Sequence, residues 1–188
     1  RNKAATEKAF LPGGWYRTGD IGELDERTGR MRIVDRLKHV VKTAQGEFVS
    51  PETVENVLSS SSLVRQIYVC ANPLWPATAA VVVPVESLRG RDVADVHAAV
   101  RKELVRVGLR EGLQSWEIPR GVVVSWEPFA EENGLLTPTA KKARRALDRR
   151  YGADLRQAME GADAAGATGV PAPVVESTAA DPEGLPTA

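Results

Sequence analysis

The sequence predicts an α+β fold in which short hairpins precede a small sheet flanked by helices. Three observations support this class. Short alternating runs separated by glycine turns fill the beginning of the chain, two apolar runs (LVRQIYVCAN and ATAAVVVPV) follow, and other segments carry apolar residues at helical spacing. After the hairpins the order is helix, strand, strand, helix, strand, helix, which is typical of a small domain with one sheet.

The hairpins come first along the chain. IGELD and MRIVDR flank a turn at residues 26–29, and HVVKTA and EFVS flank a second turn around Gln45 and Gly46. Two-stranded hairpins of this kind need a larger sheet or barrel against which to bury their inner faces.

Two helices have clear start signals. Ser50 is the predicted N-cap of the first, with Pro51 at its first position and apolar residues at helical spacing after it. The second is expected from Asp92 to about Val107, and IPRGVVVSW reads as the strand that follows.

A last helix is predicted from about Ala140 to Met159, with Thr137 as its N-cap. Lys141 and Lys142 would then lie in its first turn, where the helix dipole disfavours cations. Their position therefore suggests a function outside this helix.

The composition changes after Gly161. The segment 161–188 has no Lys, Arg or aromatic residue and is rich in Ala, Pro, Gly and Thr. Such a segment buries too little apolar surface to offset its ordering entropy, so we expect a disordered linker that leads to a following domain.

Bulk composition narrows the function classes. The 25 basic and 25 acidic residues cancel, so no global field favours nucleic acid or an anionic membrane. No apolar run approaches the length of a membrane span, and the single cysteine, Cys70, is expected in a buried strand and fits a reducing, cytoplasmic compartment. His39 and His97 form no metal pattern and are expected at the surface or near a hinge.

Asp20 and Arg36 are candidate nucleotide ligands. Asp20 ends the run WYRTGD, where it is either a turn residue or a carboxylate that accepts hydrogen bonds from both hydroxyls of a ribose diol. Arg36 offers a planar fork of donors at a strand end, and its alternative is a surface ion pair with Asp35.

Four further residues are candidates with plain alternatives. Lys38, Lys42 and Gly46 belong either to a solvated hairpin or to a site where Gly46 lets an extended substrate pass close to the backbone. Lys141 belongs either to a solvated helix face or, at a mobile helix start, to the site of another domain. There it could neutralise charge on a transferring phosphate. A nucleic-acid face is a minor reading, because no aromatic residues interleave the basic ones.

Three separated motifs resemble one family. YRTGD, GRMRIVDRLKHVVKTAQGEFVSPETVE and LLTPTAKKARRAL, in this order, resemble the C-terminal part of the acyl-adenylating (ANL) superfamily: acyl- and aryl-CoA ligases, peptide-synthetase adenylation domains and luciferases. The resemblance runs from about Gly14 to Met159. KTAQGEFV and KKARRALDRRYG look most like the adenylation domains of carboxylic acid reductases and the related carboxylic acid ligase domains of polyketide synthase loading modules.

The resemblance implies a domain division and residue roles. Residues 1–37 would end a large N-terminal adenylation core with its β-barrel strands, and residues 38–160 would form a mobile C-terminal subdomain hinged at Lys38. Asp20 and Arg36 would contact the ATP ribose, and Lys141 would bridge the substrate carboxylate and the α-phosphate. After rotation, the hairpin with Lys42 and Gly46 would face the active site, with Gly46 lining the phosphopantetheine tunnel.

The implied activity is that of an acid–thiol ligase. It would form an acyl-adenylate from ATP and a small carboxylic acid, with Mg²⁺ bound mainly by a core absent from this chain. It would then pass the acyl group to the phosphopantetheine thiol of a carrier protein. Free CoA as the acceptor, or a non-catalytic carrier-docking module, are the alternatives. Because the chain has no Gly-rich phosphate loop, it is expected to be inactive by itself.

Overall fold

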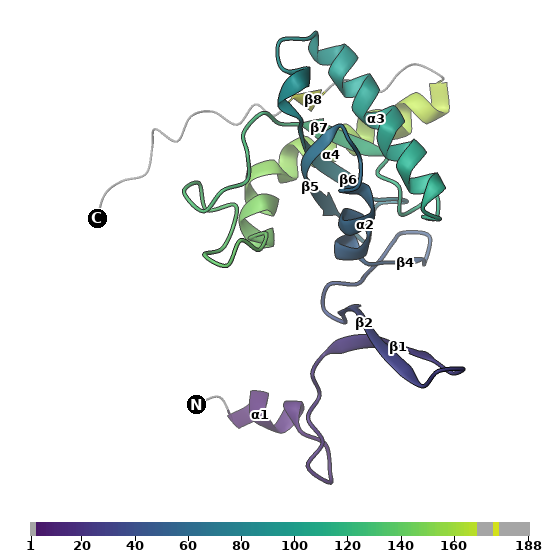
Figure 1. Ribbon diagram of the computed structural model, residues 1–188, viewed down its shortest axis with the longest axis vertical. Coiled ribbons are helices and arrows are strands. Elements are labelled where there is room, and N and C mark those ends of the chain that lie inside the picture. The colour runs from purple at the N-terminus through teal and green to yellow at the C-terminus, as the bar shows by residue number, and fades with distance from the viewer. Residues whose placement is uncertain (1–2, 169–174, 177–188) are drawn as a thin grey trace.

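The computed structural model describes residues 3–168 and 175–176. Figure 1 shows two parts joined by one narrow segment. The smaller part holds α1 (Lys3–Ala9), which the sequence analysis did not predict, and the hairpin of β1 (Asp20–Asp25) and β2 (Arg30–Arg36). The larger part holds the remaining elements, so the predicted α+β class is confirmed.

Both predicted hairpins form. β1 and β2 pair antiparallel with Asp20 opposite Arg36, and Asp25 closes the turn by accepting a hydrogen bond from the Arg27 amide at 2.9 Å. β3 (Val41–Lys42) pairs antiparallel with β4 (Phe48–Val49). Gly46 lies in their turn at φ +92°, a conformation that side chains other than glycine rarely adopt.

The sheet of the larger part has the order β5, β6, β7, β8. β5 (Val64–Cys70) runs antiparallel to β6 (Ala79–Pro84), whereas β7 (Gly121–Val124) and β8 (Val175–Glu176) continue the sheet in parallel. Every residue of β6 is buried, which fits a strand whose two faces are both covered.

Helices cover the two faces of this sheet. α2 (Pro51–Leu58) and α3 (Val93–Arg110) lie over one face, and α4 (Arg144–Thr168) lies over the other (Figure 1). The alternation of a strand divides β6 between them: Val82 packs with the α2 and α3 side chains, while Val81 and Val83 pack with those of α4. The larger part is therefore a three-layer arrangement with two apolar cores.

Predicted caps set the starts of α2 and α3. The Ser50 hydroxyl accepts a hydrogen bond from the Thr53 amide at 3.2 Å, and Pro51 follows at the first helical position. Asp92 accepts from the Ala94 amide at 2.9 Å, and α3 then extends to Arg110.

The predicted start of the last helix was wrong. α4 begins at Arg144, because the preceding residues fold back as a tight turn: the Thr137 amide donates to the Lys141 carbonyl at 2.7 Å, and Leu136 bridges Lys142 antiparallel. Ala140 has φ +56°, which is incompatible with a right-handed helix. Lys141 and Lys142 are therefore not first-turn helical residues.

The end of α4 also differs from the prediction. The helix continues to Thr168, past the predicted linker boundary at 161, and Ala162 is buried in it. β8 also falls inside the predicted linker, where it pairs with β7. Residues 169–174 and 177–188 of that predicted linker lie outside the described residues.

The smaller part leaves large apolar side chains uncovered. Among the described residues, most of the chain's exposed large apolar side chains precede Lys38; they are Phe10, Leu11, Trp15, Tyr16, Leu24, Met31, Ile33 and Leu37. None of the described helices is both long enough and apolar enough to cross a membrane.

Candidate functional site

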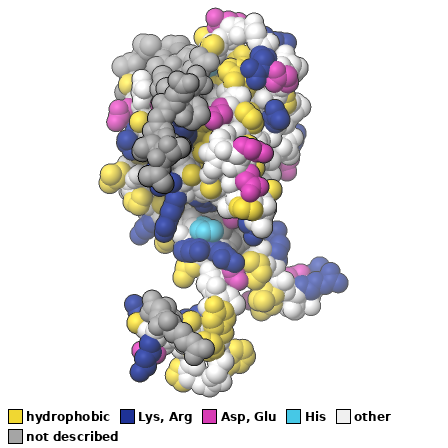
Figure 2. Space-filling view, turned by 90° about the vertical axis from the view of Figure 1, so that its left-hand side faces the viewer, with side chains coloured by type: hydrophobic (Ala, Val, Ile, Leu, Met, Phe, Trp, Pro, Cys, Tyr) yellow, Lys and Arg dark blue, Asp and Glu magenta, His cyan; other side chains and the backbone are white. Residues whose placement is uncertain are grey.

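An open cleft lies at the junction of the two parts. Asp20 and Arg36 line it from the β1–β2 hairpin, Lys38 from the connecting turn, and Lys141 from the turn before α4. Figure 2 shows Lys and Arg side chains gathered at this junction. The structure thus brings together four predicted site residues that are far apart in the sequence.

Asp20 and Arg36 face each other across the hairpin. Because their backbones are register partners, the Arg36 Nε lies 3.3 Å from the Asp20 Oδ1. The Thr18 hydroxyl accepts a hydrogen bond from the Asp20 amide at 3.1 Å. One carboxylate can accept about four hydrogen bonds, so the ion pair leaves Asp20 with capacity for a ligand's hydroxyl groups.

Lys38 lies where the two parts connect. The Leu37 amide donates a hydrogen bond to the Gly19 carbonyl at 2.7 Å. The His39 amide donates to the Arg36 carbonyl at 2.8 Å, so Lys38 lies within a tight turn. His39 lies beside this junction as predicted, with its Nδ1 3.7 Å from the Glu52 carboxylate.

Lys141 projects from the base of the turn before α4. The Thr137 hydroxyl accepts a hydrogen bond from the Lys141 amide at 3.2 Å, which fixes the backbone at this point. The side chain is exposed, and within residues 3–168 and 175–176 its ammonium group makes no hydrogen bond or ion pair. Its charge is therefore available to an anion in the cleft.

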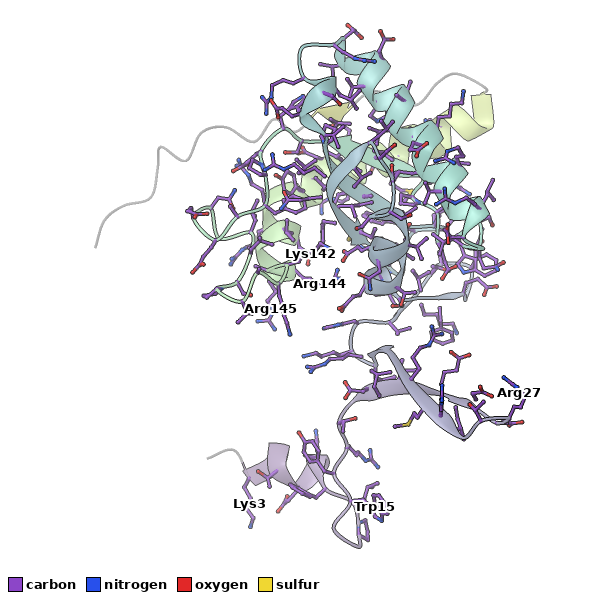
Figure 3. All side chains as sticks on the ribbon, in the orientation of Figure 1. Lys3, Trp15, Arg27, Lys142, Arg144 and Arg145 are labelled. Atoms are coloured by element: carbon purple, nitrogen blue, oxygen red, sulfur yellow. The ribbon has the colours of Figure 1, made fainter. Side chains whose placement is uncertain are left out.

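Glu55 is a site residue that the sequence analysis missed. Its side chain is 2% exposed. Its carboxylate accepts hydrogen bonds from Lys142 Nζ at 2.8 Å, from Arg144 at 3.0 and 3.1 Å, and from the Val69 amide at 2.8 Å. Figure 3 shows Lys142 and Arg144 side by side at the start of α4. Arg144 also lies over the Tyr68 ring, 5.6 Å from its centroid.

A sequence signal for Glu55 existed. The buried residues of α2 are Pro51, Val54, Glu55 and Leu58, which follow the spacing of a helix stripe that faces a core. A carboxylate within such a stripe requires buried partners. The structure shows that Lys142 and Arg144 are those partners. The position of Glu55 in the stripe was therefore the signal for a buried ion pair.

The cleft has an excess of positive charge. Its basic residues outnumber its three acidic ones, Asp20, Glu52 and Glu55. Glu55 forms ion pairs with both Lys142 and Arg144, and its one negative charge offsets one of their two positive charges. Among the described residues, the remaining cations without a recorded ion pair are Lys38, Arg65, Lys141, Arg145 and Arg149. A cleft with this balance suits a polyanionic ligand such as a nucleotide.

Lys42 and Gly46 lie outside this cleft. Lys42 extends over Phe48, with its Nζ 5.7 Å from the ring centroid, and the neighbouring Ala44 amide donates to the Trp75 carbonyl at 3.0 Å. The six predicted site residues therefore divide into a cleft group and a hairpin group in this structure.

The remaining titratable candidates are structural. His97 is buried, contrary to the expectation of a surface position, and its Nε2 lies 2.9 Å from the Val122 carbonyl oxygen; burial lowers the pKa of its imidazole. Cys70 is half-buried at the end of β5, and burial, with the nearby Asp148 carboxylate, raises its thiol pKa to about 12. Within the described chain, no cluster of three or more His, Cys, Asp or Glu residues is placed to hold a metal ion.

Comparison with known proteins identifies relatives. No family model matches the chain. It is 39% identical over 162 residues to long-chain-fatty-acid–CoA ligase 1 of Cavia porcellus, which covers 78% of this chain and 23% of the relative. It is also 39% identical over 155 residues to carboxylic acid reductase of Mycobacterium tuberculosis, with 81% of this chain and 13% of the relative covered.

A solved structure agrees with these sequences. The A-PCP didomain of carboxylic acid reductase from Segniliparus rugosus, in complex with AMP, matches with a TM-score of 0.78 and 34% identity, covering 89% of this chain and 23% of that one. The chain spans about a quarter or less of these proteins. It is therefore a homologue of one part of the acyl-adenylating (ANL) superfamily enzymes, related to both carboxylic acid reductases and long-chain acyl-CoA ligases.

Proposed function

We propose that this chain is the C-terminal part of an ATP-dependent carboxylic acid ligase that forms an acyl-adenylate. One observation carries the proposal: Lys141 lines the same cleft as Asp20, Arg36 and Lys38, although the turn that bears it lies on a separate part of the chain. The relationship to an AMP-bound reductase domain supports the same chemistry.

The proposed reaction assigns a task to each cleft residue. The substrate carboxylate attacks the α-phosphorus of ATP, the bond to the β-phosphate oxygen breaks, and pyrophosphate leaves. The Lys141 ammonium stabilises the charge that the carboxylate and α-phosphate oxygens share in the transition state. Asp20 accepts hydrogen bonds from the ribose hydroxyls, and Arg36 orients Asp20 and contacts the ribose. Mg²⁺ would be held by other parts of the enzyme, because the described residues offer no metal-binding cluster.

A second half-reaction explains the hairpin group. Lys42 and Gly46 lie outside the cleft, so their participation requires the larger part to rotate about Lys38. Gly46, at φ +92° and without a side chain, would then let a phosphopantetheine arm pass close to the backbone. The thiol of the arm displaces AMP and leaves an acyl thioester.

The acceptor thiol has two candidate sources. Similarity to a didomain that joins an adenylation domain to a carrier domain favours a carrier protein as the acceptor. This holds both for a protein in which a reductase domain comes after the carrier and for one in which polyketide synthase modules do. Similarity to long-chain-fatty-acid–CoA ligase 1 at the same identity favours free CoA. Acyl transfer by the full-length parent protein, assayed with CoA and with its own carrier domain, distinguishes the two. The rate of acyl transfer to the preferred acceptor should be at least about tenfold higher than the rate to the other.

The adenylation step is tested by pyrophosphate exchange in the full-length parent protein with a panel of carboxylic acids. Lys141→Ala should lower acid-dependent exchange by at least about a hundredfold, as expected when a charge-stabilising group is removed. Lys102→Ala, an exposed lysine on α3, is the matched control and should retain exchange. Equal exchange in both variants would remove Lys141 from the mechanism and favour the non-catalytic docking module.

A further inference from the structure

The turn that carries Lys141 is held by backbone hydrogen bonds and, on its C-terminal side, also by an ion cluster. On its N-terminal side, Leu135 is buried and its carbonyl accepts a hydrogen bond from the Ala143 amide at 2.9 Å. On its C-terminal side, the next residue, Lys142, and the first helical residue, Arg144, both reach the Glu55 carboxylate. Lys141 lies between these two anchors.

The anchor leads back to the connection between the two parts. Glu55 belongs to α2, which follows the hairpin of β3 and β4 and so comes soon after Lys38 in the chain. The Val69 amide donates to the same carboxylate, which ties α2 to β5 as well. The ion cluster therefore joins the Lys141 turn to the elements that begin the larger part.

Ion pairing with Glu55 also distinguishes the roles of Lys142 and Lys141. Lys142 and Arg144 are partly buried and both are held by the Glu55 carboxylate, so they are poorly placed to bind a phosphate. Lys141 is exposed to the cleft and has no such partner among the described residues. Adjacent lysines thus have different functions because only one of them reaches Glu55.

On the basis of the proposed function, we propose that Glu55 is a positioning residue for adenylation. By holding Lys142 and Arg144, it sets the place of Lys141 in the cleft without touching the substrate. A displacement of about 1 Å at a catalytic group can cost roughly a hundredfold in rate, so the loss of such an anchor should be measurable.

The experiment uses the full-length parent protein and treats the two half-reactions separately. Adenylation is measured by pyrophosphate exchange with an acid that the wild type accepts. Acyl transfer is measured by supplying the corresponding synthetic acyl-adenylate with pantetheine as acceptor. The variants are Glu55→Gln, Lys141→Ala and the double variant, with Glu103→Gln as the control. Glu103 pairs with Arg106 on α3 at 2.7 Å and does not line the cleft.

We expect Glu55→Gln to lower kcat for exchange by about ten- to a hundredfold, with acyl transfer within about twofold of wild type. In the Lys141→Ala background, Glu55→Gln should add less than about twofold, because the two residues act through one ammonium group. Glu103→Gln should leave both half-reactions unchanged.

Other results overturn the inference. Equal losses in both half-reactions, a full additive loss in the double variant, or unchanged exchange in Glu55→Gln would each assign Glu55 a purely structural role or none. If Glu55→Gln does not fold, Lys142→Met keeps the test open: it leaves the Arg144 and Val69 bonds in place and should lower exchange alone by about threefold or more. Absence of acid-dependent exchange in the wild type would instead refute the proposed function itself.

Discussion

Asp20 and Arg36 close the open end of the β1–β2 hairpin, with 3.3 Å between the carboxylate oxygen and the guanidinium Nε. The hairpin register sets this pair, so its geometry does not depend on the other side of the cleft. A preformed carboxylate of this kind binds a diol with little reorganisation.

Asp20→Asn should therefore raise the KM for ATP in the full-length parent protein by about tenfold or more, since a hydrogen bond to a charged group contributes about 1.5–3 kcal/mol. The control is Glu23→Gln in the same strand, which removes only a surface pair with Arg32. Equal KM values for the two variants would exclude Asp20 from ATP binding.

Replacing Ala140 by glycine should stabilise the folded chain. Its φ of +56° places an L side chain in the left-handed region, where glycine carries no steric penalty. Ala140→Gly should raise the free energy of unfolding by up to about 1 kcal/mol, and Ala140→Val should lower it by at least about 1 kcal/mol. Urea unfolding of the three chains measures both changes, and a more stable Val variant would contradict the turn described here.

Gly121 should not tolerate a side chain. A Cβ at this position would lie 2.8 Å from the Met159 backbone nitrogen and 3.0 Å from the Ala158 carbonyl carbon, both in α4. Gly121→Ala should therefore destabilise the chain by about 2 kcal/mol or more, because backbone rather than a flexible side chain must move. Gly152→Ala is the control in α4 itself. Its nearest neighbour would be an Arg156 side-chain atom at 3.8 Å, so it should stabilise by about 0.5–1 kcal/mol.

His97 should make stability depend on pH. Burial lowers its pKa below the usual value of 6.5 in the folded chain, so the neutral imidazole is the folded form. As the pH falls below about 6.5, the unfolded chain takes up a proton that the folded chain does not. The contribution of His97 is thus complete above that pH and is lost as the pH falls towards the lowered pKa.

Urea unfolding at about pH 7.5 and about pH 5 checks this, with an expected loss of up to about 1.4 kcal/mol per pH unit from this residue. His97→Gln should flatten the pH profile, and His39→Gln should preserve it. A profile that is flatter without His39 than without His97 would show that His39, and not His97, carries the pH dependence.

Local signals in the sequence predicted much of the fold. The caps at Ser50 and Asp92 and the turn at Gly46 are satisfied by residues nearby in the chain, so composition and spacing identified them. The continuous apolar run of β6 likewise indicated a buried strand. The cleft residues were identified through ordered motifs rather than through any long-range pattern.

The wrong predictions have a tertiary cause. Thr137 and Pro138 look like a helix start, but the buried Leu135 and the attraction of Lys142 to Glu55 favour a turn there instead. The continuation of α4 beyond 161 depends on the burial of Ala162, which no local composition rule predicts. His97 was expected at the surface because it is polar. It is buried because the neighbouring strand β7 provides the Val122 carbonyl as a hydrogen-bond partner.

The uncovered apolar side chains before Lys38 bear on the handling of the isolated chain. Trp15 is 74% and Met31 71% exposed, and exposed apolar surface promotes association in water. The chain prepared alone should scatter light increasingly with concentration. A version that begins at Lys38 keeps both apolar cores of the larger part and should remain monodisperse, which makes it the better starting point for spectroscopy in solution.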